Sequence, residues 1–180
     1  MTSFMGTYLL FLATTIYFYF LATTLSLINS TLSQFGIYLL LPGLFLSIPV
    51  TLNKNLRRTL VILSGFLIDY NCDLPLGFSV FFLISIHFIL EDQFKLSMLK
   101  SLNDRRIILI SVNLLFFITL FIMSKFDRFL LGQWHSFNFI FDLLVSSIVL
   151  FFLLPIQFSI TSLLEHKFFS DSDENPYLLK

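Results

Sequence analysis

Long uncharged stretches separated by short charged ones dominate this chain, and their lengths predict its elements. About 20 apolar residues in a helix cross the hydrocarbon core of a bilayer, which is about 30 Å thick. Arg57 and Arg58 border one shorter stretch, which can also cross because long basic side chains reach the interface from within the apolar layer. We therefore expect an all-α, polytopic membrane protein with six transmembrane helices, at Gly6–Ile28, Phe35–Leu52, Thr59–Tyr70, Leu74–Leu90, Ile107–Met123 and Phe139–Phe158.

The positions of the basic residues test this number of crossings. With six crossings and both termini in the cytoplasm, nine of the eleven Lys and Arg lie inside, as the positive-inside rule expects. Without a crossing at Thr59–Tyr70, the later basic groups would move to the side opposite the earlier ones. The charge pattern therefore supports the short span. The nine inside bases are Lys54, Arg57, Arg58, Lys95, Lys100, Arg105, Arg106, Lys167 and Lys180, and the two outside are Lys125 and Arg128.

Composition narrows the class of protein further. Hydrophobic residues make up 57% of the 180 residues and charged residues 12%, which is about half the charged fraction of a soluble domain. The formal net charge is +0, so no basic excess points to nucleic acid, and the single cysteine, Cys72, excludes a disulfide framework within the chain. We expect one integral membrane domain over 1–169 and an acidic, disordered cytoplasmic tail over 170–180.

The stretch Ser64–Gly77 combines small, acidic and turn-forming residues at the end of a predicted span. Gly65 and Asp69 are four residues apart, so on a helix they share a face, and the glycine permits close approach of a second helix. Pro75 and Gly77 then reverse the chain. Two interpretations stay open for Asp69. It reaches the outer interface in a tight helical hairpin, or it anchors a polar contact or ligand where spans meet, because acids inside membranes are costly.

The spacing of Gly65, Asp69 and the run Pro75-Leu76-Gly77 resembles the Gly-x-x-x-Asp and Pro-Leu-Gly elements of the rod-shape-determining membrane protein family MreD. The resemblance implies a non-enzymatic adaptor of the bacterial cell-elongation and peptidoglycan-synthesis machinery, located in the inner membrane. It also implies an MreC-like bitopic partner, which acts alongside an MreB-like filament, a SEDS glycosyltransferase and a penicillin-binding transpeptidase. The family's fold is thought to be similar to that of energy-coupling-factor substrate-binding subunits, so a vitamin-transport subunit is the alternative function.

Chemistry-bearing residues do not form a recognisable set in the sequence. His87, His135 and His166 fall at the inner side, the outer side and the tail, so they cannot share a metal ion, and no serine lies in a Gly-x-Ser-x-Gly elbow. We therefore expect no catalytic, cofactor or metal site. Asn113 is expected to form an interhelical hydrogen bond. Asp142 is interpreted as a solvated interface acid, with a functional role as the alternative.

Two connecting segments carry residues that could dock partners. Glu91–Arg106 places Phe94, Met98 and Leu102 on one helical face, which favours a helix on the inner leaflet, with a cytoplasmic partner as the alternative. On the outer side, Lys125–Asn138 contains Phe129 and Trp134 among charged residues. Aromatic side chains at that depth usually form an interfacial belt, although the same surface could meet a partner.

Overall fold

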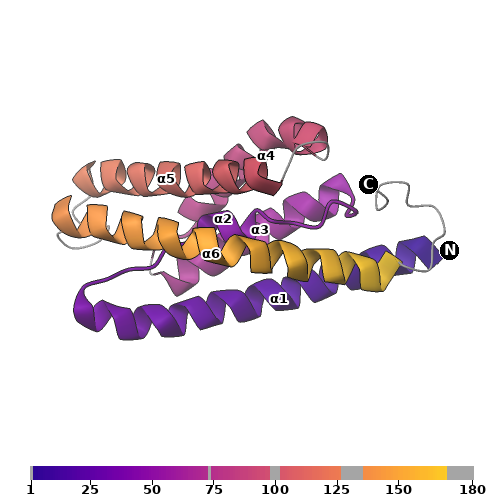
Figure 1. Ribbon diagram of the computed structural model, residues 1–180, viewed down its shortest axis with the longest axis horizontal. Coiled ribbons are helices and arrows are strands. Elements are labelled where there is room, and N and C mark those ends of the chain that lie inside the picture. Colours follow the sequence, from indigo (N-terminus) through magenta and orange to yellow (C-terminus); the bar gives the residue numbers. More distant parts are fainter. Residues whose placement is uncertain (1, 73, 98–101, 127–135, 170–180) are drawn as a thin grey trace.

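The structure of this chain is a computed structural model that describes residues 2–72, 74–97, 102–126 and 136–169 (Figure 1). The described residues form helices and no strand, which confirms the predicted all-α class. Five of the six predicted spans coincide with helices, and the tail 170–180 lies outside the described residues. The elements are α1 (Thr2–Leu32), the 3-10 turn η1 (Ser33–Phe35), α2 (Pro42–Phe45), α3 (Lys54–Asn71), α4 (Phe78–Ser97), α5 (Leu102–Phe126) and α6 (Ser136–Phe169).

Three helices in the described ranges are long and apolar enough to cross a membrane. They are α1, α5 and α6, with apolar spans at Met5–Phe35, Asp104–Met123 and Asn138–Phe168. A shorter apolar helix, Phe78–Leu90, forms most of α4. Their length and composition agree with the membrane-protein class that the sequence predicts.

The prediction of one helix over Phe35–Leu52 is wrong. After Gly36, which has a left-handed backbone with φ of 71°, the chain continues without helical structure to Leu41. Helix α2 is only four residues long, and irregular chain follows it to Asn53. Pro42 and Pro49 favour this break, because proline fits the first turn of a helix and disfavours helical structure in the preceding residue. Proline does not end every helix here, since Pro155 lies inside α6. A prediction from hydropathy alone does not include this effect of proline on the backbone.

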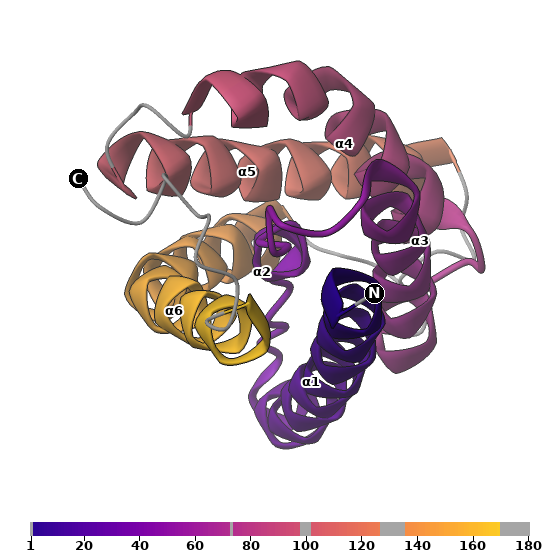
Figure 2. The ribbon, with the colours of Figure 1, turned by 90° about the vertical axis from the view of Figure 1, so that its right-hand side faces the viewer.

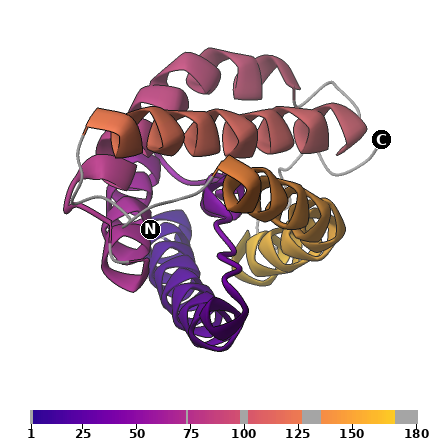
Figure 3. The same ribbon diagram turned by 90° about the vertical axis from the view of Figure 1, so that its left-hand side faces the viewer.

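The short helix α2 lies inside a ring of longer helices. Figure 2 shows α1, α3, α5 and α6 around it, and Figure 3 shows the same ring from the opposite end. Leu44 and Phe45 are almost completely buried there. A Cβ atom on Gly43 would lie 2.8 Å from the carbonyl oxygen of Leu109 in α5, so the glycine allows α2 to pack directly against that helix backbone. The centre of the bundle is therefore occupied by a segment that is mostly not helical.

Helices α1 and α6 run antiparallel along nearly the whole length of the molecule (Figure 1). At one end, a Cβ atom on Gly6 would lie 3.0 Å from the carbonyl oxygen of Phe168. Farther along, the hydroxyl group of Tyr17 donates a hydrogen bond to Oε1 of Gln157. The start of α1 and the end of α6 therefore lie at the same end of the bundle.

The crossing of α3 and α4 depends on one glycine. A Cβ atom on Gly65 would lie 2.5 Å from Cα and 2.6 Å from the backbone nitrogen of Val80. Real Cβ atoms do not approach a backbone this closely, so a larger residue would push the two helices apart.

We predict that Gly65→Ala lowers the free energy of unfolding by about 1–3 kcal/mol, because the added methyl group meets helix backbone that cannot move aside locally. Thermal unfolding of the purified protein in mild detergent, followed by circular dichroism, measures the change. Ser111→Ala is the control, because its exposed hydroxyl group bonds only to its own helix at Ile107. Equal stability of the two variants would contradict the close helix contact.

Candidate functional site

Asp69 binds the first turn of the neighbouring helix. Its side chain is 1% exposed, Oδ2 accepts the backbone N–H of Gly77 at 2.7 Å, and Oδ1 accepts that of Ser79 at 2.9 Å. These amides begin α4 and have no partner within that helix. A carboxylate at this position also interacts favourably with the positive end of the helix dipole. Asp69 therefore caps α4 and makes a polar contact where two helices meet.

The turn between α3 and α4 uses the other residues of the sequence motif. The backbone N–H of Leu74 donates to the carbonyl oxygen of Asp69 at 3.0 Å, and that of Phe78 donates to Pro75 at 3.0 Å. Gly77 has a φ of 96°, a left-handed conformation that other residues rarely adopt. The structure thus brings Asp69, Pro75 and Gly77 into one turn, below which Gly65 forms the close helix crossing.

A second polar arrangement binds the start of the irregular segment. The backbone N–H of Tyr38 donates to Oδ1 of Asp142 at 3.0 Å, and that of Leu40 donates to Oγ of Ser146 at 3.2 Å. Between them, the side chain of Asn29 binds both backbone polar groups of Leu39. Its Oδ1 accepts the N–H and its Nδ2 donates to the carbonyl oxygen, each at 2.8 Å. One side chain of α1 and two of α6 thereby replace the hydrogen bonds that a helix would have formed.

The same arrangement continues to the far end of α6. The amide of Gln157 donates to the carbonyl oxygen of Leu44 at 3.5 Å, while its Oε1 accepts the hydroxyl group of Tyr17. Oε1 of Glu165 accepts the backbone N–H groups of Val50 and Thr51 at 2.6 and 3.1 Å. We call these side chains the anchoring row: Asn29, Asp142, Ser146, Gln157 and Glu165.

The anchoring row extends over a membrane-sized distance. Asp142 and Glu165 are about 34 Å apart at 1.5 Å per helical residue, and the chain between Tyr38 and Thr51 covers that distance beside α6. The irregular segment therefore runs the length of the bundle, as the predicted second span would, with its backbone bonded to side chains. Unbonded backbone groups are not tolerated in the hydrocarbon layer, which makes such bonding necessary there.

The anchoring row corrects the sequence interpretation of Asp142. We expected a solvated interface acid, but its side chain has 0% exposure and bonds to Tyr38. Ser146, Gln157 and Glu165 were not identified from the sequence. The sequence does contain a signal for them, which is their helical spacing. The residues on one buried stripe of α6 are Asp142, Ser146, Leu150, Leu154, Gln157 and Thr161.

Other residues singled out from the sequence lie apart from these two sites. Asn113 is fully buried in α5, but neither its Nδ2 nor its Oδ1 has a hydrogen-bond partner in the described part of the chain, so the expected interhelical bond is not seen there. His87 is also buried, in α4. The residues proposed for docking lie outside the described side chains: Phe94, Met98, Leu102, Phe129 and Trp134.

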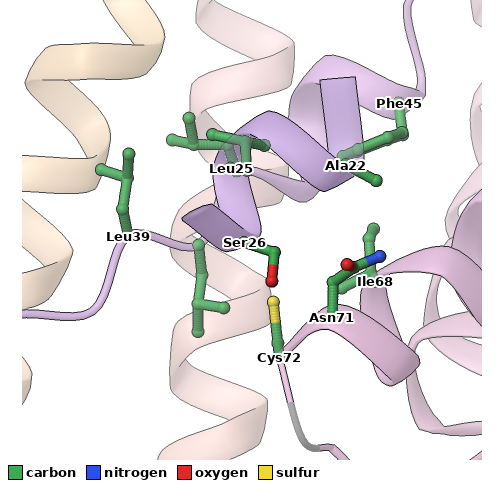
Figure 4. A pocket seen from close by; sticks show the side chains of 10 residues that line it. Ala22, Leu25, Ser26, Leu39, Phe45, Ile68, Asn71 and Cys72 are labelled. Atoms are coloured by element: carbon green, nitrogen blue, oxygen red, sulfur yellow. The ribbon is translucent and has the colours of Figure 1, made fainter. Parts of the chain in front are cut away.

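A small pocket opens between α1, α3 and the irregular segment (Figure 4). Its volume is about 20 Å³, which is room for about one water molecule. Ser26, Asn71 and Cys72 bring polar atoms together on one side, as Figure 4 shows. No group of three or more His, Cys, Asp or Glu residues suited to a metal ion occurs within the described ranges.

Comparison of the chain with protein-family models, with curated proteins and with solved structures finds no match. The case for a function therefore rests on the chain's own residues. At both polar sites, side-chain oxygens bind backbone amides of the same chain, as structural contacts do.

We predict that Asp69→Leu destabilises the protein by about 1–3 kcal/mol for each of the two amides that lose their acceptor. Asp69→Asn retains one carbonyl acceptor, so its loss should be roughly half as large. Thermal unfolding in detergent gives the comparison. The capping role would be refuted by a leucine variant as stable as the wild type, or by an asparagine variant as damaged as the leucine variant.

A matched pair of adjacent serines tests the anchoring row. Ser146→Ala removes the acceptor of the Leu40 amide and should cost about 1–3 kcal/mol, because a buried amide then loses its hydrogen bond. Ser147→Ala, one residue along the same helix and partly exposed, should change the free energy of unfolding by less than about 0.5 kcal/mol. The measurement is chemical unfolding in mixed micelles. Similar losses in both variants would mean that helix α6 is sensitive to any serine replacement.

Proposed function

We propose that this protein is a non-enzymatic membrane adaptor of the MreD type, which binds an MreC-like bitopic protein in the bacterial cell-elongation machinery. The observation that carries the proposal is the turn built by Gly65, Asp69, Pro75 and Gly77. Each of these motif residues has a distinct structural role, in close helix contact, in helix capping or in turn formation. If these four residues matched the family's spacing by chance, they would not have to lie in one structural unit. They do lie in one unit, and this supports the resemblance.

The proposed topology has six crossings, with the irregular segment as the second. It is supported by the contact of Gly6 with Phe168, because an even number of crossings returns the chain to its starting side. Lys54, Arg57 and Arg58 begin α3 at that same end, next to the segment bound by Glu165. By the positive-inside rule we propose that this end is cytoplasmic, with both termini on that side, in the bacterial inner membrane that the adaptor role implies.

The surface proposed for the partner lies on the outer side of the Asp69 turn. Leu76 is 79% exposed and Tyr70 is 80% exposed, on a turn that hydrogen bonds hold in one conformation. Apolar groups fixed in advance bind partners better than mobile ones, because less conformational entropy is lost on binding. A rigid turn with exposed apolar side chains is suited to an adaptor.

The alternative is the substrate-binding subunit of an energy-coupling-factor vitamin transporter. Ligand pockets for small molecules usually have volumes of about 300–1,000 Å³. The pocket beside Cys72 has about 20 Å³, and its lining is mainly aliphatic. This pocket would have to enlarge greatly to hold a vitamin.

We predict that purification from native membranes in mild detergent co-isolates an MreC-like bitopic protein, identified by mass spectrometry. Leu76→Ser should reduce its recovery at least fivefold, because it removes an exposed apolar contact without disturbing the turn. Phe35→Ser is the control, since Phe35 is 78% exposed at the same end of the molecule but outside the motif. Recovery of a stoichiometric vitamin with an ATPase module would overturn the adaptor and establish the transport alternative.

A further inference from the structure

The two sides of the bundle, one formed by α1 and α6 and the other by α3 and α4, have apolar helix segments of very different length. We call each side a wall and the length of its apolar helix segment its apolar height. The apolar spans of α1 and α6 are each 31 residues long, or about 46 Å, and both exceed the thickness of a bilayer core of about 30 Å. The apolar part of α4, Phe78–Leu90, reaches only about 20 Å, and Glu91 and Asp92 follow it directly. The α3–α4 side is therefore about 10 Å shorter than the hydrocarbon layer.

Two residues with interfacial preferences mark the ends of this short wall on α3. The guanidinium group of Arg58 lies over the ring of Phe88, 4.6 Å from its centre, so its charge sits at the level of that ring, within the hairpin. Tyr70 is 80% exposed at the opposite end, and tyrosine side chains prefer the headgroup region. Arg58 and Tyr70 are about 18 Å apart along the helix.

The outer face of the short wall is not covered by other described parts of the chain. Phe66 on α3 is 47% exposed, and Phe81 and Ile89 on α4 are 75% and 66% exposed. Apolar side chains with this exposure contact lipid tails in a membrane. Tilting either helix would shorten its projection on the membrane normal and enlarge the mismatch.

We propose that the bilayer thins along the α3–α4 face, from about 30 Å to about 20 Å, to match the apolar height of the hairpin. The surface that this face fits is a thinned lipid layer whose headgroups approach Arg58 on one side and Tyr70 on the other. On the α1–α6 side the bilayer keeps its full thickness. The inference rests on the membrane embedding proposed above and is independent of the adaptor role.

Nitroxide labels test the proposal in the full chain reconstituted into vesicles of dioleoylphosphatidylcholine and dioleoylphosphatidylglycerol. In a Cys72→Ser background, single cysteines replace Phe81 and Ile89 on α4, two exposed positions that leave Arg58 and Tyr70 intact. The matched control positions are Ile148 and Ile156 on α6, which have the same separation along a helix and are 58% and 56% exposed. The ratio of collisions with oxygen and with a nickel chelate reports the depth of each label.

While the two labels of a pair lie on opposite sides of the bilayer midplane, the sum of their depths, each measured from the nearer headgroup boundary, does not depend on how the protein is shifted vertically. Each pair is about 12 Å apart along its helix axis, so for a helix parallel to the membrane normal a core of 20 Å gives a sum of about 8 Å and a core of 30 Å a sum of about 18 Å. We expect about 8 Å at the α4 pair and about 18 Å at the α6 pair. Sums of about 18 Å at both pairs would overturn thinning while leaving the membrane fold intact. Control labels outside the hydrocarbon would overturn the embedding, and thinning with it.

Discussion

The fold depends on one constraint: the backbone of the irregular segment must be hydrogen-bonded inside the bundle, because lipid offers no partners. Between Tyr38 and Thr51 the amides at both ends bond to side chains of α1 and α6. These bonds fix α6 lengthwise, since Asp142 must meet Tyr38 at one end while Glu165 meets Thr51 at the other. The positions of α1 and α6, the two longest helices, are thus set by the hydrogen bonds that the backbone of the irregular segment requires.

The requirement for backbone hydrogen bonds also explains the contacts of the described acidic side chains inside the bundle. Asp69, Asp142 and Glu165 each accept at least one backbone N–H, and Asp69 and Glu165 accept two. Removing a carboxylate from water is costly unless hydrogen bonds replace the lost hydration, and bonds to a charged acceptor are stronger than neutral ones. Acids that are occupied in this way hold backbone in place.

Much of the helical architecture could be predicted from the sequence because apolar length decides it. The spans in α1, α5 and α6 and the hairpin of Gly65 and Asp69 follow from uncharged length and from residue spacing. The irregular segment could not be found in this way, because hydropathy records apolar content and not hydrogen bonding. Pro42 and Pro49 were the available signal. Ser146 and Gln157 were missed because single polar residues in an apolar helix reveal no partner until the fold places one beside them.

The capped turn fixes the register of the α3–α4 hairpin. Asp69 can reach the amides of Gly77 and Ser79 only from the last turn of α3, and Gly65 can approach Val80 in only one register. The two helices therefore cannot slide along each other to increase the apolar height of the wall. A mismatch that the protein cannot relieve would have to be relieved by the lipid. In both proposals made above, for the partner surface and for the thinned bilayer, the capped turn is therefore the element that fixes the geometry.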